Sequence, residues 1–244
     1  MDDSELPPLQ PGTLYLVATP IGNLEDITLR ALRTLKHCDC LAAEDTRRAR
    51  TLLTRYEIAK PVVSCHRFNE ARRSEEMIER LQSGETVALI SDAGSPGISD
   101  PGERMVRAAV AVGLRVEAVP GPCALVAAVT ASGLPTDELH FKGFLPHKSG
   151  QRIRTLERLR SYAGTLVLYE SPHRVEKLLG ELARTHAERF VVIARELTKR
   201  FEEYMRGTPN ELCELVKNRR MRGEFVVMVG PENVRKTESS APCP

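Results

Sequence analysis

The sequence predicts an α/β protein whose first half is built on a mostly parallel sheet. Five times in succession, a short β-rich run is followed by a stretch with apolar residues at helical spacing. Such alternation is typical of parallel sheets, because parallel strands need a crossover connection between them. Gly84, Gly113 and Gly133 stand where helices are expected to end, since glycine readily adopts the left-handed conformation found there.

The five units follow one another from Thr13 to Gly133, each with its strand first and its helix second. The expected pairs are TLYLVAT (13–19) and DITLRALRTLKHC (26–38), CLAAE (40–44) and TRRARTLLTRY (46–56), PVVSC (61–65) and NEARRSEEMIERLQ (69–82), TVALIS (86–91) and GERMVRAAVAVG (102–113), and RVEAV (115–119) and CALVAAVTASG (123–133).

The pattern changes after Gly133. The stretch 133–150 carries Gly and Pro with one short strand candidate, LHFKGF, as a connection between domains would. Further on, the sequence predicts a mixed sheet from TLVLYE (165–170), RFVVIARE (189–196), RFEEYMRG (200–207) and EFVVMVG (224–230). We expect two α/β domains, over 1–121 and 122–231, and a disordered tail over 232–244.

Composition narrows the class of protein. The chain of 244 residues is 41% hydrophobic, enough to bury a core, and its 35 Lys and Arg nearly balance its 33 Asp and Glu. The basic residues nevertheless concentrate in four stretches, 45–55, 66–73, 147–160 and 217–222. If these share a face, that face attracts phosphate; the alternative is ordinary solvated helix surface.

Cysteine spacing and the first residues bear on metal binding and location. No pair of the six cysteines has the two-residue gap of a zinc or thioredoxin-like motif, so we expect no metal. The acidic, proline-rich start resembles neither a signal peptide nor an anchor, and no apolar run approaches the ~20 residues of a spanning helix. We therefore expect a reduced, cytoplasmic protein without a membrane association.

Two loops predict a ligand site. LISDAGSPGISDPG (89–102) ends the fourth strand, and VPGPCA (119–124) ends the fifth. Open α/β sheets bind ligands at the carboxyl ends of their strands, and glycines let the backbone approach a ligand closely. The first strand is followed by ATPIGN rather than G-x-G-x-x-G, which argues against an ordinary dinucleotide fold. An elaborate structural turn is the alternative.

Seven blocks carry a resemblance to a known family. They are LYLVATPIGNLEDITLRAL (14–32), AAEDTRR (42–48), LISDAGSPGISDPG (89–102), VPGPCALVAAVTASGLP (119–135), FKGFLPHK (141–148), LYESPHR (168–174) and ARELTK (194–199). In this order they resemble the bacterial small-subunit ribosomal RNA cytidine-2′-O-methyltransferases of the tetrapyrrole methylase superfamily. The resemblance covers roughly residues 12–230.

The resemblance implies a two-domain, tetrapyrrole methylase-like (class III methyltransferase) fold, a homodimer, and S-adenosylmethionine as the methyl donor. It also implies a substrate, the ribose of a decoding-centre cytidine of 16S rRNA in the small ribosomal subunit. The residues that it implies for donor binding are Pro20, Asp92, Ala93, Gly94, Ser95, Ile98, Pro120, Gly121, Pro122, Ala124, Tyr169, Glu170, Ser171, Ala194, Gly223 and Glu224.

Transfer of a methyl group to a hydroxyl oxygen needs positioning, and a group that accepts the departing proton or stabilises the oxyanion. Within the family blocks we rank Glu44 and Glu170 first as bases, and Arg47 and Lys199 first as groups that hold phosphate or the oxyanion. For each of them, a structural ion pair is the alternative.

Other functions stay open at this point. One is methylation of a tetrapyrrole carbon in corrinoid or sirohaem synthesis, which would favour an apolar cleft; another is a ribosome-assembly factor without turnover. Many family members also continue into a small helical module that is thought to hold RNA, whereas this chain ends fourteen residues after Gly230. This departure concerns the exact target nucleotide more than methylation itself.

Overall fold

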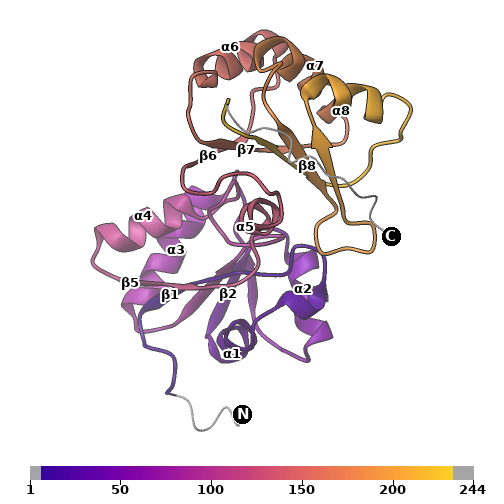
Figure 1. Ribbon diagram of the computed structural model, residues 1–244. Helices are drawn as coiled ribbons and strands as arrows, with labels where there is room; N and C mark the ends of the chain where they lie inside the picture. The colour runs from indigo at the N-terminus through magenta and orange to yellow at the C-terminus, as the bar shows by residue number, and fades with distance from the viewer. Residues whose placement is uncertain (1–6, 233–244) are drawn as a thin grey trace. The chain divides into compact units, whose positions relative to one another are not determined.

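The computed structural model describes residues 7–232 (Figure 1). The predicted tail, beyond its first residue Glu232, lies outside the described residues. The chain divides into two compact units, with the boundary between Cys123 and Ala124. Among the described residues, no helix is both long and apolar enough to cross a membrane.

The first unit contains a sheet of five strands. They are β1 (Thr13–Val17), β2 (Cys40–Ala43), β3 (Val62–Ser64), β4 (Val87–Ile90) and β5 (Arg115–Val119). Their spatial order is β3-β2-β4-β1-β5 and every pairing is parallel, which confirms the predicted parallel sheet. Consequently β1 lies between β4 and β5, and β2 lies on the other side of β4.

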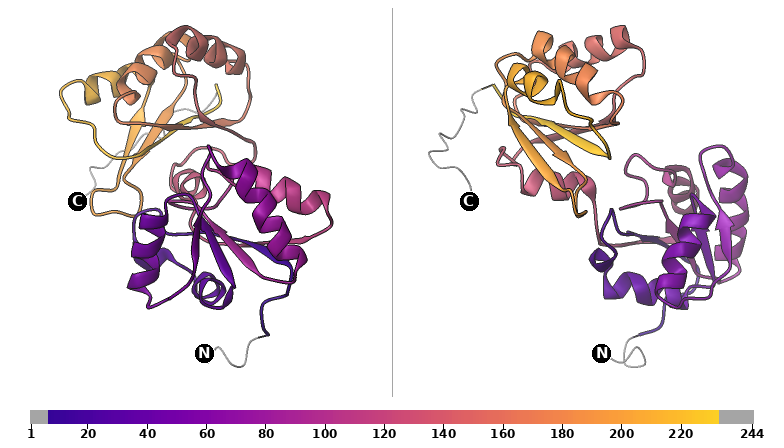
Figure 2. Two further views of the ribbon diagram at one scale, coloured as in Figure 1. Left: turned by 180° about the vertical axis from the view of Figure 1, so that it is seen from behind. Right: turned by 90° about the vertical axis from the view of Figure 1, so that its right-hand side faces the viewer.

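Helices cover both faces of this sheet (Figure 2). They are α1 (Leu29–His37), α2 (Thr46–Arg55), α3 (Glu70–Gln82) and α4 (Glu103–Ala111), with a short 3-10 turn η2 (Leu24–Asp26) before α1. Successive strand residues point to opposite faces. On β1, Leu14 packs in one core with Met77 of α3, whereas Tyr15 packs in the other with Leu35 of α1.

Local signals set the helix limits. The Thr28 hydroxyl accepts a hydrogen bond from the Ala31 N–H at the start of α1, and the Asp45 carboxylate accepts one from the Arg47 N–H at the start of α2. Gly84 and Gly113 follow α3 and α4 with φ of +93° and +74°. These two glycines therefore end their helices as predicted.

The second unit contains a mixed sheet, as predicted. Its strands are β6 (Leu139–Phe144), β7 (Thr165–Glu170), β8 (Val191–Arg195), β9 (Glu203–Gly207) and β10 (Phe225–Val229). The order is β6-β7-β10-β8-β9, with β6 parallel to β7 and the other pairings antiparallel.

The interpretation of 133–150 as an interdomain connection is wrong. The stretch lies inside the second unit, and LHFKGF forms the edge strand β6. The register shifts between Phe141 and Gly143, and Gly143 has φ +65°. The glycine that suggested a linker therefore forms a bulge, a common feature of edge strands.

Four helices complete the second unit: α5 (Ala124–Thr130), α6 (Ser149–Leu159), α7 (Val175–Thr185) and α8 (Pro209–Val216). Leucines and valines of α6, α7 and α8 form one core with the sheet. Helix α5 is attached to β9, because the Tyr204 hydroxyl donates to the Ala127 carbonyl (3.1 Å) and the Arg206 guanidinium donates to the Ala131 carbonyl (2.7 Å).

A buried ion pair joins α6 to α7. Arg152 and Glu181 are each 3% exposed, with Arg152 Nη2 2.6 Å from Glu181 Oε1. Burial by itself raises the pKa of Glu181, but hydrogen bonds from Arg152 and Ser149 outweigh it and leave that pKa below its ordinary value. Arg152 also donates to the Pro146 and His147 carbonyls (3.3 and 3.1 Å). It therefore stabilises the β6–α6 loop and is unavailable to phosphate.

Replacing Glu181 by Ala leaves the Arg152 charge buried without its partner. We expect Glu181→Ala to lower the free energy of unfolding by about 3–5 kcal/mol, measured by urea denaturation. The exposed Glu176 on the same helix is the control, and Glu176→Ala should change stability by less than about 0.5 kcal/mol. Equal stability of the two variants would contradict a stabilising role for the buried pair.

Candidate functional site

The donor-binding residues predicted in the first unit gather at one edge of its sheet, the edge formed by the carboxyl ends of the strands. Because all five strands are parallel, the loops after β1, β4 and β5 leave the sheet at the same edge, and these strands are neighbours. The predicted residues on these three loops are Pro20 after β1, Asp92, Ala93, Gly94, Ser95 and Ile98 after β4, and Pro120, Gly121 and Pro122 after β5.

Backbone hydrogen bonds hold the first two loops together. Thr19 and Gly94 exchange two hydrogen bonds of 2.9 Å each, and the Thr19 hydroxyl donates to the Ser91 carbonyl (3.3 Å). Gly94 has φ +82°, and an added Cβ would lie 3.2 Å from Ile21 Cγ2. Glycine is favoured here both by the left-handed backbone conformation and by the limited space beside Ile21.

The loop after β5 packs against the other two. The Ser95 hydroxyl donates to the Pro122 carbonyl (3.2 Å). At Gly121, an added Cβ would lie 2.9 Å from the Ala18 Cβ, which is closer than real Cβ atoms approach. The three loops therefore form one closely packed surface.

Two carboxylates meet beside these loops. Glu44 follows β2 and Asp92 follows β4; the Asp92 N–H donates to Glu44 Oε2 (3.4 Å), and the Asp45 N–H donates to Asp92 Oδ1 (3.0 Å). Burial, and then the charge of Asp92, raise the pKa of Glu44 above its ordinary value. A raised pKa makes the Glu44 carboxylate a better proton acceptor, which general-base chemistry favours.

Arg47 lies in the first turn of α2 with its side chain 87% exposed. Its guanidinium contacts Asp45 through Nε–Oδ1 (3.2 Å) and Nη2–Oδ2 (2.8 Å). This pairing holds the pKa of Asp45 well below its usual range. The predicted role of Arg47 in holding phosphate or an oxyanion therefore competes with a local ion pair.

In the second unit, Tyr169, Glu170 and Ser171 lie at the end of β7. The Tyr169 hydroxyl accepts from the Leu125 N–H at the start of α5 (3.0 Å). Glu170 is 2% exposed, its Oε1 accepts from the Ser171 N–H (2.8 Å), and its Oε2 lies 3.1 Å from Arg174 Nη2. Such burial and pairing favour a structural role for Glu170 over that of a base.

Lys199 belongs to a second polar cluster, in the loop after β8. Its Nζ lies 2.9 Å from Glu196 Oε1 and 3.3 Å from Glu224 Oε2. Burial lowers the pKa of Lys199, but these carboxylates outweigh it and raise that pKa overall. Glu196 has φ +50°, and an added Cβ at Gly223 would clash with the Glu196 carboxylate. Gly223 thus makes room for the carboxylate that holds Lys199.

Two predicted donor-binding residues differ in setting from the others. Ala194 lies in the middle of β8, paired with Val226 and Tyr204, and is 0% exposed. Ala124 is the first residue of α5. Of these two, Ala194 offers no accessible surface to a ligand in this structure. No three His, Cys, Asp or Glu side chains between residues 7 and 232 lie close enough to hold a metal ion.

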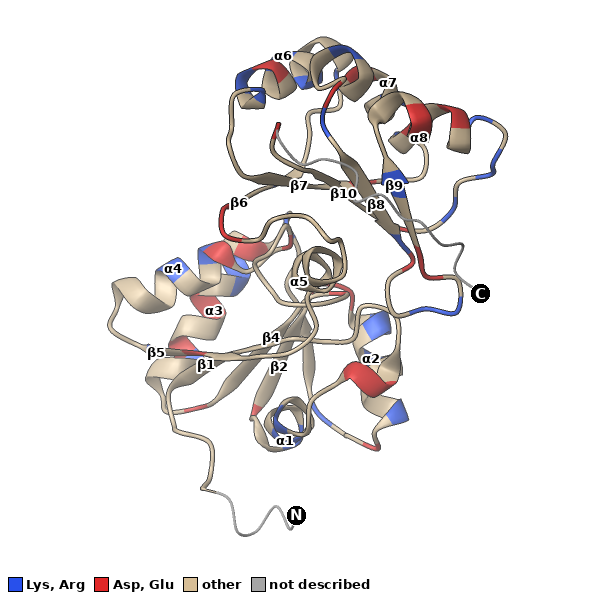
Figure 3. Ribbon diagram, in the orientation of Figure 1, with Lys and Arg blue, Asp and Glu red and all other residues tan. Residues whose placement is uncertain are grey.

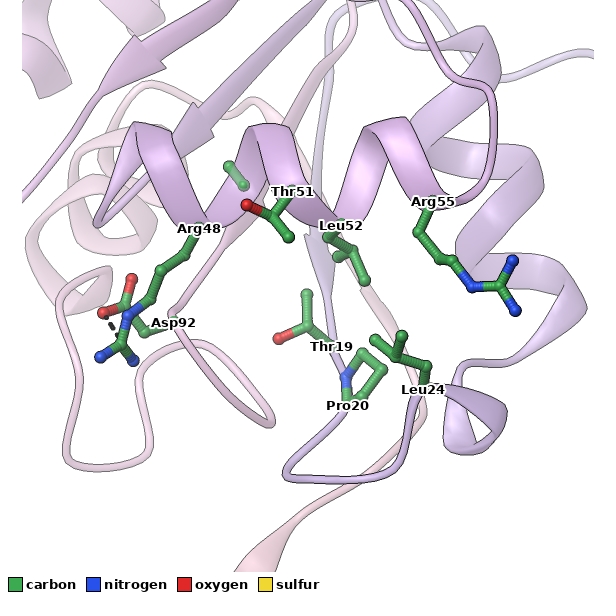
Figure 4. Close-up of a pocket in the computed structure, with 9 residues that line it drawn as sticks. Thr19, Pro20, Leu24, Arg48, Thr51, Leu52, Arg55 and Asp92 are labelled. Atoms are coloured by element: carbon green, nitrogen blue, oxygen red, sulfur yellow. Dashed lines mark ion pairs between the residues drawn. The ribbon is translucent and has the colours of Figure 1, made fainter.

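A pocket of about 340 Å³ opens beside the Thr19–Gly94 pair (Figure 4). It is lined by Thr19, Pro20, Leu24, Arg48, Ala49, Thr51, Leu52, Arg55 and Asp92. Sequence reasoning selected Pro20 and Asp92. It placed Arg48 and Arg55 in the basic stretch 45–55 without selecting them individually, and it missed Leu52. The i, i+4, i+7 spacing of these three residues, which places them on one face of α2, was the available signal.

The four basic stretches, whose Lys and Arg are blue on the ribbon in Figure 3, are only partly available to phosphate. Arg152 of the third stretch is buried, and Arg219 of the fourth contacts Glu203 (2.9 Å). In the first stretch Arg48 contacts Asp92 (3.3 Å), whereas Arg50 and Arg55 are exposed and their side chains form no ion pair or hydrogen bond within residues 7–232.

Comparison with known proteins identifies the family. Residues 13–213 match the model of the Tetrapyrrole (Corrin/Porphyrin) Methylases. The chain is 48% identical over 218 residues to "Ribosomal RNA small subunit methyltransferase I" of Halalkalibacterium halodurans, covering 89% of this chain and 75% of that protein. The chain belongs to the tetrapyrrole methylase family. A Mesorhizobium japonicum member is 49% identical over 239 residues, covering 96% and 81%.

Solved structures confirm the tetrapyrrole methylase fold. Diphthine synthase has a TM-score of 0.73 at 18% identity, covering 91% of each chain. Uroporphyrin-III C-methyl transferase from Thermus thermophilus, complexed with S-adenyl homocysteine, has a TM-score of 0.62 at 20% identity, covering 89% of this chain and 97% of that chain. The family and fold predictions are thereby confirmed, while the individual site residues stay predictions.

Neighbouring carboxylates should affect stability with opposite signs. The pKa of Glu44 is raised on folding, so the stability associated with its protonated form is lost as the pH rises through that pKa. Glu44→Gln should therefore be at least as stable as the wild type at pH 8, and any advantage should vanish below about pH 4. Thermal melts across this pH range test the expectation.

Asp45→Ala provides the contrast. The pKa of Asp45 is lowered on folding, so its contribution is present at neutral pH and is lost as the pH falls through the lowered pKa. This variant also loses the cap of α2, so it should melt below the wild type at pH 8. A Glu44→Gln protein that melts as low as Asp45→Ala would show that Glu44 is mainly structural.

Gly94 and Gly97 form a second matched pair, since both have φ +82° in the same loop. Either change to Ala should cost about 1 kcal/mol through the left-handed conformation. Only Gly94→Ala also meets Ile21 Cγ2, because nothing lies within 4 Å of a Cβ at Gly97. Gly94→Ala should therefore be the less stable variant in urea denaturation. Equal losses of stability in the two variants would show that Ile21 moves aside at no energetic cost.

Proposed function

We propose that this chain transfers a methyl group from S-adenosylmethionine to the ribose 2′-hydroxyl of a decoding-centre cytidine of 16S rRNA. The observation that carries the proposal is the 48% identity over 89% of the chain to a protein named as a ribosomal RNA small subunit methyltransferase. The cytidine target follows from the resemblance of the seven sequence blocks. In this proposal the acceptor is the small ribosomal subunit, the enzyme acts in the cytoplasm, and it is a homodimer.

The residues at the edge of the first sheet fit the methyl donor. S-adenosylmethionine carries a positive sulfonium and an ammonium group, and the Glu44 and Asp92 carboxylates would attract both. Gly94 and Gly121 let the three loops pack closely together, which fixes the backbone that faces the donor in this proposal. When bound, the donor supplies an electrophilic methyl group.

The chain itself must orient the acceptor and take up its proton. Positioning of two reactants contributes about 7–11 kcal/mol of barrier lowering. Glu44, with its raised pKa, is a better proton acceptor than an ordinary glutamate. Arg47 and Lys199 already hold carboxylates, and in this proposal they exchange these partners for phosphate or the developing oxyanion.

The decisive experiment follows labelled methyl groups. The wild-type chain with labelled S-adenosylmethionine is offered unmethylated small subunits, free 16S rRNA or a tetrapyrrole acceptor in parallel. We expect label at a decoding-centre ribose. Label in the tetrapyrrole alone would establish the alternative enzyme, and donor binding without transfer to any acceptor would favour an assembly factor. The Gly94→Ala chain should bind the donor several-fold more weakly than Gly97→Ala.

The pH profile tests Glu44. In the wild type, the rate of methyl transfer should fall as the pH decreases through the raised pKa of Glu44, because the protonated carboxyl cannot accept the 2′-hydroxyl proton. Glu44→Gln should lower the rate by roughly 100-fold or more and flatten this limb. An unchanged acidic limb in Glu44→Gln would assign the base to another residue.

A further inference from the structure

The pocket between α2 and the loop after β1 has an apolar middle and charged ends. Its middle is apolar, formed by Pro20, Leu24 and Leu52, and Leu24 is 43% exposed. Arg48 and Arg55 stand at the two ends (Figure 4). They are seven residues apart on the helix, which separates their Cα atoms by about 10 Å along the axis.

Apart from the two arginines, the polar groups of the pocket can accept hydrogen bonds from a ligand. The Thr19 hydroxyl donates to the Ser91 carbonyl and the Thr51 hydroxyl donates to the Arg47 carbonyl, so both retain lone pairs for a ligand. Asp92 adds a carboxylate. A ligand that suits these groups presents N–H or O–H donors near its centre.

The two arginines indicate which groups the ends of a ligand should carry. The Arg55 side chain forms no hydrogen bond or ion pair within residues 7–232, and Arg48, although it contacts Asp92, has a side chain that is 66% exposed. Two guanidinium groups at the ends of a short groove are suited to two separate phosphates. They are unsuited to the sulfonium of the methyl donor.

The volume of the pocket favours a nucleotide over a larger anionic ligand. A volume of about 340 Å³ lies near the lower end of the range for small-molecule pockets, roughly 300–1,000 Å³. A nucleoside fits this volume, whereas a four-ring tetrapyrrole with its carboxylate side chains is much larger. Asp92 lines the pocket and also belongs to the loop predicted to hold the donor. The pocket is therefore next to that loop.

We infer that this pocket receives an unpaired nucleotide of the RNA substrate. Its base lies on Pro20, Leu24 and Leu52, and its two flanking phosphates contact Arg48 and Arg55. This inference rests on the proposed function and adds to it the place where the first unit binds the acceptor strand. Single-stranded RNA is commonly read in this way, by contact with the face of a splayed-out base.

The test compares two arginines of α2. Arg50 is exposed and free of ion pairs like Arg55, but does not line the pocket. In methyl transfer to small subunits, Arg55→Ala should raise KM about tenfold, while the Kd for S-adenosylmethionine stays within about twofold of the wild type. Arg50→Ala should leave both values unchanged. Arg55→Lys, which keeps the charge, should recover part of the loss.

Salt dependence provides a second readout. Loss of one phosphate contact should reduce the slope of log(1/KM) against log salt by about 0.7 in Arg55→Ala and not in Arg50→Ala. Equal KM values and slopes for the two variants would overturn the inference while the proposed function stands. If the wild type itself transfers no methyl group to RNA, the proposed function fails, and the inference fails with it.

Discussion

The parallel pairing of β1 with both β4 and β5 is the constraint on which the candidate site depends. It brings the loops after three strands to one edge, although they are separated by more than 70 residues of sequence between Thr19 and Gly94 and by a further helix and strand before Gly121. Once they are adjacent, the Thr19–Gly94 hydrogen bonds and the Ser95–Pro122 contact hold them together. The position of β2 beside β4 then places Glu44 against Asp92. A slip of any one pairing would separate these groups.

In the proposed function, helix α2 connects the two kinds of chemistry that methyl transfer to RNA requires. Its N-terminus is capped by Asp45, next to the Glu44–Asp92 pair. One of its faces carries Arg48 and Arg55, and Arg48 contacts Asp92 directly. The helix therefore begins at the carboxylates that suit a cationic donor and extends along a pocket with arginines at both ends. Alternation of charge over this short distance keeps the net charge of the region small while giving each end its own selectivity.

Much of the fold was accessible from sequence, because it depends on local periodicity and on turn residues. The strand–helix alternation and the glycines after α3 and α4 are of this kind. Contacts between distant residues were not accessible. Glu170 has the carboxylate that a general base needs, but its partner Arg174 and its burial appear only in the folded chain. Arg152 looked like a phosphate ligand within a basic stretch, yet Glu181 from another helix holds it inside the unit.

Two locally unfavourable features of the structure lie in sequence blocks of the family. Glu44, in AAEDTRR, is a carboxylate whose pKa is raised by burial and then by the neighbouring Asp92. Glu196 and Thr198, in ARELTK, hold φ of +50° and +64°, where residues with side chains are strained. The sheets require neither feature, because neighbouring positions form the same strands without them. Proteins tolerate such local costs mainly at sites where binding or catalysis needs the arrangement. In the proposed function, the edge of the first sheet and the loop after β8 are places where methyl transfer accounts for features that packing alone does not require.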